Sequence, residues 1–372
     1  MFSEIVEAEK RLNNLLPATQ PEQSPPAALL AAAKAWSQAV WSVASRLGPM
    51  PLPAEGAADG RALAHKPVFI FGVHRSGTTL LRDLLDGHPA LAVLPSEGAY
   101  LTNLEQHLLA LPTEERMAYL GTEWLRRLAN PINQPPYWLL GRSNEGGSPY
   151  VDFARWLVTW WPLVQDLGSQ WPHMAVVLAY ASSTDGTGTD YWVDKTPVNE
   201  RFYDRLSREM PQARFIHIIR HPVDTLSSRK KMEPSVSFRS ALRDLKMSFR
   251  LAASQQNRLK DHHYLLLRYE HVCTEPQATA AAIAAFLNID HLPILGVPTV
   301  AGKFTSANSS FNKAAASGLI IKHESRGDAF LAGIEHQMLS AYAGKVSASL
   351  GYPLPRKAWL QGLYLRLRHR LW

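Results

Sequence analysis

The sequence has a single cysteine, Cys273, among its 372 residues, so it can form neither an internal disulfide nor a cluster of thiolate metal ligands. A lone free cysteine is usually a small buried or half-buried side chain, and we expect this of Cys273. No apolar run reaches the roughly 18 to 20 residues that a membrane-spanning helix needs. The N-terminus is acidic and periodic, whereas a signal peptide is basic and then apolar, so we expect a cytoplasmic protein.

The composition excludes global disorder and indicates anionic partners. Hydrophobic residues make up 46% of the chain and charged residues 19%, which is enough apolar surface for a substantial core. The chain has 39 Lys and Arg against 32 Asp and Glu, a formal net charge of +7. This excess favours phosphates, sulfates, nucleic acid or anionic lipid as partners, and does not choose among them.

The N-terminal part predicts helices separated by proline-rich segments. Residues 1–16 have the pattern of a short amphipathic helix, and residues 17–28 form a proline-rich connector. Residues 29–47 are alanine-rich with apolar residues at helical spacing, which predicts a second helix. Residues 48–60 contain several prolines and glycines and are predicted to be a loop. We therefore assign residues 1–60 to an N-terminal helical extension with a linker.

The next part of the chain alternates strand and helix patterns. Four apolar segments have strand character, at residues 67–73, 90–95, 214–220 and 263–272. Strands separated by helices predict βαβ units, and so an α/β domain over residues 61–355 with three layers, a central parallel sheet flanked by helices. Ligands of such domains bind at the carboxyl ends of the strands.

Residues 100–190 interrupt this alternation and are rich in tryptophan. The tryptophans of this insertion are Trp124, Trp138, Trp156, Trp160, Trp161 and Trp171. Two interpretations of these tryptophans stay open. They form the core of a helical insertion, or they line an acceptor-side pocket or lid over the sheet, because large aromatic residues are common in both places.

The C-terminal tail, RKAWLQGLYLRLRHRLW at residues 356–372, is basic and amphipathic. A packed terminal helix explains this pattern. Weak peripheral contact with the anionic inner face of a membrane, or with a partner, is the alternative.

The segment VFIFGVHRSGTTLLRDLL at residues 68–85 looks like a phosphate-binding loop without its lysine. An apolar strand pattern reaches Gly72, a polar loop follows, and a helical pattern begins near Thr78. A nucleotide-triphosphate loop has the sequence G-x-x-x-x-G-K-[ST]. Gly72 and Gly77 have this spacing, but Thr78 stands in the place of the lysine.

The loop has the parts of an anion-binding site. Gly72 and Gly77 permit a tight turn whose backbone N–H groups point inward, and the helix that follows offers its positive end. Thr78 and Thr79 add hydroxyl groups, and Arg75 adds a fixed charge with a planar set of donors. The residues therefore predict a P-loop-like oxyanion site.

A kinase is an alternative that these residues leave open. A P-loop kinase needs the lysine, a Mg²⁺ ion held by Ser or Thr, and usually an Asp that ends another strand. None of the four predicted strands ends in Asp after an apolar run, and the strand at 214–220 ends in Arg220. We therefore expect an anionic donor that needs no metal. A P-loop kinase or nucleotide-binding protein with an atypical loop stays possible, and it predicts Mg²⁺-dependent ATP binding.

The stretch FGVHRSGTTLLRDLLDGHP resembles the 5′-phosphosulfate loop of sulfotransferases, which use 3′-phosphoadenosine 5′-phosphosulfate (PAPS). R-S-G-T-T is similar to the branch that contains bacterial and tyrosylprotein sulfotransferases, whereas the cytosolic branch has K-S-G-T-T. The resemblance implies that five residues hold the 5′-phosphosulfate, namely Arg75, Ser76, Gly77, Thr78 and Thr79. It covers most of the chain between residues 66 and 352.

A second motif, RFIHIIRHPVDTLSSRKKM, resembles the family's 3′-phosphate site. Its R-x-P-x-D-x-x-x-S pattern is matched at Arg220, Pro222, Asp224 and Ser228. The resemblance implies that Arg220 and Ser228 bind the 3′-phosphate, and an arginine with a serine hydroxyl suits a phosphate.

Charged residues around this motif have simpler interpretations. We interpret Asp224 as a helix-start residue, because a carboxylate there favours the helix dipole and would repel a phosphate. We expect Arg229, Lys230 and Lys231 to be solvated.

Sulfuryl transfer to a hydroxyl needs a base, positive charge and in-line placement. In LPSEGAYL, Glu97 follows the second predicted strand, and the resemblance implies that Glu97 is the catalytic base. A surface glutamate is the alternative interpretation. His74, His88 and His221 are rival bases, since a neutral imidazole accepts protons near pH 7.

The segment YWVDKTPVNERF contains Lys195. Its D-K-T-P is similar to an N-K-D-P segment of the same branch, whose lysine contacts the leaving oxygen. The resemblance implies that Lys195 stabilises the developing charge together with Arg75. A solvated lysine before a proline turn is the alternative.

A later segment, FTSANSSFNKAA at residues 304–315, resembles serine-bearing loops of the family. Ser309, Ser310 and Lys313 are its candidates for contact with the donor. The spacing departs from the tyrosylprotein pattern, and an ordinary solvated loop is an equal alternative.

The resemblance thus implies a sulfotransferase that moves a sulfuryl group from PAPS to a hydroxyl group. Because the sequence shows no secretory signal or anchor, we expect a bacterial-type enzyme whose acceptor is a small metabolite, a glycan or a lipid precursor. We expect no metal and no nucleic-acid partner. Besides the kinase, a catalytically silent member of the fold is an alternative, and it predicts PAPS binding without turnover.

Overall fold

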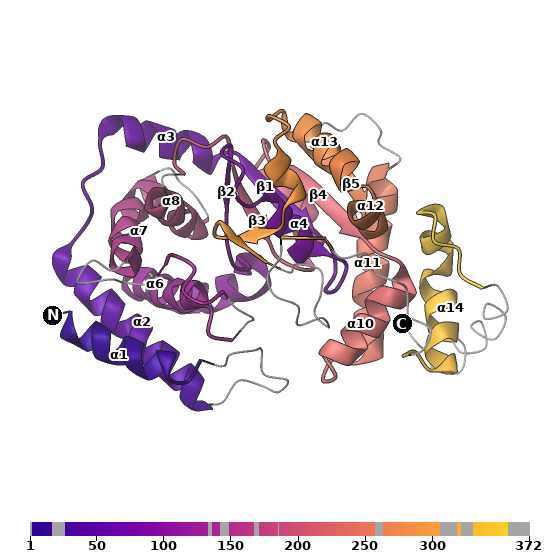
Figure 1. Cartoon of the computed structure of the whole chain (residues 1–372), viewed down its shortest axis with the longest axis horizontal. Coiled ribbons are helices and arrows are strands. Elements are labelled where there is room, and N and C mark those ends of the chain that lie inside the picture. The colour runs from indigo at the N-terminus through magenta and orange to yellow at the C-terminus, as the bar shows by residue number, and fades with distance from the viewer. Residues whose placement is uncertain are drawn as a thin grey trace. The chain divides into compact units, whose positions relative to one another are not determined.

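The computed structural model describes residues 2–16, 27–132, 136–141, 149–166, 171–184, 186–256, 263–305, 318–320 and 330–355 (Figure 1). The chain divides into two compact units, each assembled from separate segments. The first unit comprises residues 1–67, 85–194 and 299–305, and the second comprises 68–84, 195–298 and 306–372. The predicted domain boundaries at residues 60 and 355 stay predictions.

The first unit is built mainly of helices. Both helices predicted near the N-terminus are confirmed, as α1 (Ser3–Asn13) and α2 (Ala27–Leu47). In this unit α2 packs on α1, α6 (Thr113–Ala129) and α7 (Pro149–Asp166) (Figure 1). The apolar face of α2 supplies Trp36, whose ring meets Trp138 and Tyr150 edge-on with centroids 5.0 and 5.1 Å away. Such aromatic contacts stabilise a core beyond the area they bury.

The predicted loop at residues 48–60 is wrong in its second half, where α3 (Ala54–Ala64) begins. Extended Pro53 precedes the helix, and Glu55 lies in its first turn, where a carboxylate favours the dipole. Gly60 suggested a loop but has a packing role. A Cβ at Gly60 would lie 2.3 Å from Cη2 of Trp160, so only glycine lets the helix approach that ring.

The tryptophan-rich insertion contributes mostly to the core of the first unit. Trp124, Trp138, Trp160 and Trp171 are buried, whereas Trp156 and Trp161 are half-buried. Other elements of this unit are the π-helix at Tyr100–Leu104, α5 (Glu105–Ala110) and α8 (His173–Ser183). The burial of these four rings favours the core interpretation for them.

One of the strands in the first unit differs from the prediction. The predicted strand at 90–95 is confirmed as β2 (Leu91–Val93), which pairs in parallel with β3 (Tyr191–Lys195). The expectation that no strand ends in Asp after an apolar run is therefore wrong, because Asp194 lies near the end of β3. A short antiparallel pair, β6 (Thr299–Val300) and β7 (Lys303–Phe304), completes the strands described in this unit.

In the second unit three predicted strands are confirmed as a parallel sheet. They are β1 (Pro67–Phe71), β4 (Arg214–Ile219) and β5 (Tyr264–Arg268). β4 pairs with both of the others, with Val68 opposite Arg214 and Phe215 opposite Tyr264. The five residues of β1 are all buried, as expected for a strand covered on both faces.

Helices flank this sheet and confirm the predicted α/β class. The helices are α4 (Thr78–Leu85), α9 (Tyr203–Glu209), α10 (Pro222–Met232), α11 (Phe238–Gln256), α12 (Tyr269–Thr274), α13 (Pro276–Leu287) and α14 (Gly333–Ser349), with 3-10 turns at Asn199–Phe202 and Pro293–Gly296. α10, α11 and α14 lie side by side around Leu226, Leu245 and Leu339 (Figure 1). Cys273 on α12 is buried, as predicted.

None of the helices in the described ranges combines the length and the apolar character needed to cross a bilayer. The tail at residues 356–372 lies outside those ranges.

Candidate functional site

The predicted strand, loop and helix are present in the second unit, and two glycines shape the loop. β1 ends at Phe71 and α4 begins at Thr78. Gly72 and Gly77 have φ of 147° and 105°, which L side chains rarely adopt. A Cβ at Gly72 would lie 2.7 Å from the Ile218 carbonyl oxygen. The loop therefore needs glycine for its backbone and for its close packing.

Arg75 joins the two predicted phosphate motifs. Its Nε donates to the hydroxyl oxygen of Ser228 at 3.1 Å, and Nη1 of Arg220 donates to the Arg75 carbonyl oxygen at 3.4 Å. Arg75 itself has φ of 71°, a left-handed conformation that costs a residue with a side chain about 1 to 3 kcal/mol. The structure thus brings together three predicted residues from motifs about 145 positions apart.

These contacts place two guanidinium groups close to each other. Burial lowers the pKa of Arg75, the nearby Glu233 carboxylate raises it, and the positive charge of Arg220 lowers it again. Arg220 also lies over the ring of Tyr269, 4.5 Å from its centroid. An anion between the arginines would relieve their repulsion, which is the property a phosphate site needs.

The other loop residues have different roles in this structure. Ser76 is buried, and both its backbone N–H and its hydroxyl donate to the Val73 carbonyl oxygen, at 3.1 and 2.8 Å. Ser76 therefore closes the turn. Thr78 is buried and Thr79 exposed at the first turn of α4, where backbone amides lack helical acceptors.

Replacing Gly77 with alanine is expected to destabilise the protein by about 2 to 4 kcal/mol, through backbone strain and overpacking together. The new Cβ would lie 2.4 Å from Cδ2 of Tyr269. Urea denaturation measures the change. Gly344 is the matched control, because it lies inside α14 with nothing within 4 Å of a Cβ. Gly344→Ala is expected to stabilise by about 1 kcal/mol. Equal effects of the two substitutions would contradict this account of the loop.

Helix α10 corrects one expectation about charge. Asp224 lies in its first turn, as predicted. Arg229, expected to be solvated, is buried, and it pairs with Asp244 at 3.0 Å and with Glu233 at 3.2 Å. The spacing of four residues between Arg229 and Glu233 was a sequence signal for this pair. The exposed Lys230 pairs with Glu335 at 2.7 Å.

Glu97, the predicted base, lies in the first unit, and two hydrogen bonds hold the backbone at this position. Nη1 of Arg127 donates to the Glu97 carbonyl oxygen at 2.7 Å. The next residue, Gly98, donates its N–H to Oδ1 of Asp194 at 3.0 Å. Neither role was predictable for Arg127 or Asp194, because both contacts are long-range. Burial lowers the pKa of Arg127, and the charges of Glu123 and Glu97 raise it.

Lys195 is buried at the end of β3, directly after Asp194. The rival histidines have structural contacts. Nδ1 of His74 lies 3.5 Å from Glu233, Nδ1 of His88 accepts the Ala90 N–H at 3.1 Å, and His221 packs edge-on against Tyr352. These contacts favour the structural interpretation of the histidines.

Ser309, Ser310 and Lys313 lie outside the described residues. Within the described ranges there is no group of three or more His, Cys, Asp or Glu side chains that could hold a metal.

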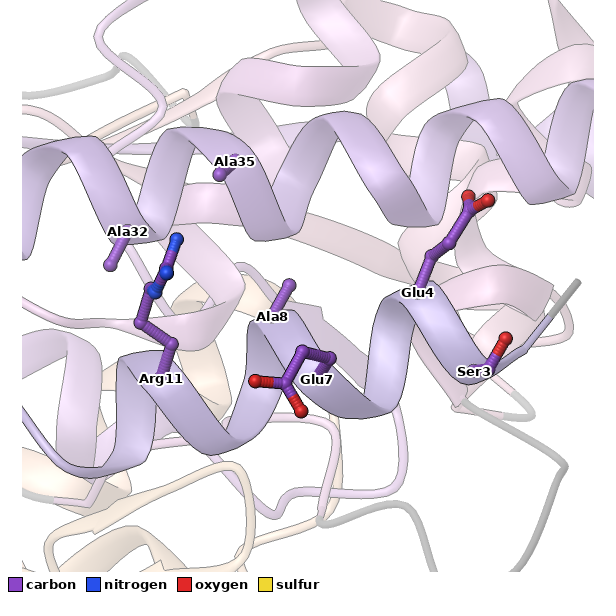
Figure 2. Close-up of a pocket in the computed structure, with 7 residues that line it drawn as sticks. All are labelled: Ser3, Glu4, Glu7, Ala8, Arg11, Ala32 and Ala35. Atoms are coloured by element: carbon purple, nitrogen blue, oxygen red, sulfur yellow. The ribbon is translucent and has the colours of Figure 1, made fainter.

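A cavity of about 430 Å³ lies between α1 and α2 of the first unit. Figure 2 shows Glu7 and Arg11 on α1 and Ala32 and Ala35 on α2 around it. None of the predicted site residues lines this cavity, and it has no part in the function proposed below.

Comparison with known proteins gave one family and several similar structures. The model of the sulfotransferase family matches residues 67–293, more than half of the chain. The sulfotransferase domain of the Synechococcus PCC 7002 olefin synthase is 19% identical with a TM-score of 0.46, over 78% of this chain and 96% of that one. The sulfotransferase domain from the curacin biosynthetic pathway is 18% identical with a TM-score of 0.44, over 78% and 99%.

The sulfotransferase from Alicyclobacillus acidocaldarius is 16% identical with a TM-score of 0.37, over 79% of this chain and 98% of that one. Similarities at this level carry no information about a substrate. A search of curated protein sequences found no match.

Proposed function

The chain belongs to the sulfotransferase family, and from that membership we propose that it transfers the sulfuryl group of PAPS to a hydroxyl group of an acceptor. One observation carries the proposal for the site, the contact of Arg75 with Ser228 and Arg220. PAPS has a 5′-phosphosulfate and a separate 3′-phosphate, so its site needs two anion-binding motifs side by side.

The proposed donor site divides between these motifs. The loop amides at Gly77, Thr78 and Thr79 and the Arg75 side chain hold the 5′-phosphosulfate, on a turn that Ser76 closes. Arg220 and Ser228 hold the 3′-phosphate. Ser309, Ser310 and Lys313 stay predictions.

The proposed chemistry is an in-line displacement at sulfur. Glu97 takes the proton of the acceptor hydroxyl, whose oxygen forms a bond to sulfur as the bond from sulfur to the bridging oxygen breaks. Adenosine 3′,5′-bisphosphate leaves with that electron pair. Lys195 and Arg75 stabilise the charge that develops on the bridging and sulfuryl oxygens. Arg127 holds the backbone of Glu97 in place through its hydrogen bond to the Glu97 carbonyl oxygen.

We propose a small metabolite, a glycan or a lipid precursor as the acceptor. The cytoplasmic compartment and the peripheral membrane contact of the tail stay predictions.

Incubation of the purified chain with ³⁵S-labelled PAPS and panels of these three acceptor classes tests the proposal. We expect a labelled product and an equal amount of adenosine 3′,5′-bisphosphate. A parallel incubation with γ-labelled ATP and Mg²⁺ is the control. Transfer of label from ATP, with none from PAPS, would reverse the conclusion in favour of the kinase alternative.

A further inference from the structure

The first glycine of the loop is held by both of its backbone groups. The Val198 N–H donates to the Gly72 carbonyl oxygen at 3.1 Å, and the Gly72 N–H donates to Oε2 of Glu200 at 3.2 Å. Both partners come from the segment that follows Lys195, and all of these residues belong to the second unit. Val198 has φ of 61°, so this segment turns sharply to reach the loop.

Glu200 is an unusual residue to find at this position. Its side chain is buried, with 3% of the residue exposed, and its Oε1 has no hydrogen-bond partner among the residues that the structure describes. An ionised carboxylate with one oxygen unpaired in the interior is costly, because it has lost its hydration. The geometry therefore favours the protonated acid.

Two neighbouring groups of Glu200 that could carry positive charge have other partners in the structure. Nε2 of His217 hydrogen-bonds the Ser248 hydroxyl at 2.8 Å, and its Nδ1 hydrogen-bonds the Tyr264 hydroxyl at 2.5 Å. Burial lowers the pKa of His217 to about 3, so its ring is neutral. The guanidinium of Arg201 pairs with Asp244.

The surroundings of Glu200 both raise and lower its pKa. Burial raises the pKa of Glu200, whereas hydrogen bonds from its own backbone, Ser248 and Gly72 and the charge of Arg201 lower it. Burial also raises the pKa of Tyr264 well above its usual value. Tyr264 is therefore neutral beside the acid.

We propose, building on the proposed function, that Glu200 is a positioning residue. As an uncharged carboxylic acid, it fixes the backbone of Gly72. In this form it accepts the Gly72 N–H without placing a negative charge beside a loop that binds an anion. A carboxylate would hold the amide more strongly, because a charged acceptor forms the stronger hydrogen bond, but it would repel the phosphosulfate.

This role makes donor affinity depend on pH. Below the pKa of Glu200 in the free protein the affinity is full. As the pH rises through that pKa, Glu200 ionises in the free protein, while the bound anion disfavours ionisation in the complex. Binding then takes up a proton, and affinity falls by up to roughly tenfold per pH unit until Glu200 also ionises in the complex.

Titration calorimetry with adenosine 3′,5′-bisphosphate between pH 5 and 10 tests the proposal. The phosphate groups of the ligand, with a second pKa of about 6, titrate alike for every variant, so their effect cancels in a ratio of affinities. We expect the ratio of the wild-type affinity to that of Glu200→Gln to fall as the pH rises, because the amide keeps the acceptor and cannot ionise. Glu200→Ala is expected to bind weakly at every pH. Glu209→Gln, which removes a carboxylate paired with Arg205, is the control and should follow the wild type.

Equal pH slopes in the wild type and Glu200→Gln would overturn the positioning role. If the Gln variant does not fold, proton uptake by the wild type decides, measured at intervals between pH 7 and 10 in buffers of different ionisation enthalpy. Uptake is expected, and its absence would overturn the proposal. No binding of the bisphosphate by the wild type at any pH is a different outcome, since it would reject the proposed function itself.

Discussion

Replacing Arg220 with alanine is expected to weaken binding of adenosine 3′,5′-bisphosphate by about 100-fold or more. Each charge-assisted hydrogen bond from a guanidinium contributes about 1.5 to 3 kcal/mol, and two of them to one phosphate reach this loss at 1.4 kcal/mol per tenfold. Arg220 also donates to the Arg75 carbonyl oxygen, so its loss loosens the neighbouring loop. Titration calorimetry of the variant and the wild type measures the difference.

Lys230→Ala is the matched control for Arg220→Ala. Lys230 lies on α10, close to Arg220 in sequence, and its side chain is half-exposed and paired with Glu335. Removing this cation tests the effect of net charge alone. Because salt screens exposed charges, we expect the affinity for the bisphosphate to fall by no more than about twofold at physiological salt. Similar losses in the two variants would mean that Arg220 acts through the overall field and makes no specific contact with the 3′-phosphate.

Glu97→Gln is expected to lower turnover by about 10² to 10⁴, the contribution of a positioned general base. The amide keeps the size of the side chain and leaves the Arg127 bond to the backbone oxygen in place. Affinity for adenosine 3′,5′-bisphosphate should therefore stay unchanged. The measurement is the rate of label transfer from PAPS to the first acceptor that the wild type sulfates, together with calorimetry of the bisphosphate.

Glu114→Gln controls for the loss of one carboxylate in the first unit, because Glu114 is exposed in the first turn of α6. It should retain full activity. A Glu97→Gln variant with normal turnover would remove Glu97 as the base. His74, His88 and His221 would then be replaced one at a time.

The loop between β1 and α4 was predictable because its backbone geometry depends on the residue types at a few neighbouring positions. The spacing of Gly72 and Gly77 matches two positions whose φ values exclude most side chains. The contact between Arg75 and Ser228 was predictable from two motifs that follow parallel strands, since the carboxyl ends of such strands share one edge of a sheet.

Local patterns failed where packing decides. Gly56 and Gly60 led to the prediction of a loop where α3 is found. The packing of Gly60 against Trp160, which requires a small residue, cannot be inferred from neighbouring positions in the sequence. β3 is only five residues long and follows a polar loop, so no strand was predicted there. The burial of Arg229 depends on Asp244, which lies on the next helix.

The supporting residues of the site were not predictable for the same reason. Glu200 and Gly72 are 128 positions apart, and Asp194 and Gly98 are 96 apart. Each pair forms one hydrogen bond between a buried carboxyl and a backbone amide, which leaves no local pattern in the sequence. Only the folded chain shows that Glu200 supports the loop and that Asp194 and Arg127 support Glu97.

The most direct test of the central claim is calorimetric titration of the wild-type chain with adenosine 3′,5′-bisphosphate and, separately, with Mg·ATP. The account predicts micromolar binding of the bisphosphate and no binding of Mg·ATP, because the loop and Arg220 are matched to a nucleotide with a 3′-phosphate. Preference for Mg·ATP would contradict it, and would mean that the loop at Gly72 holds a triphosphate.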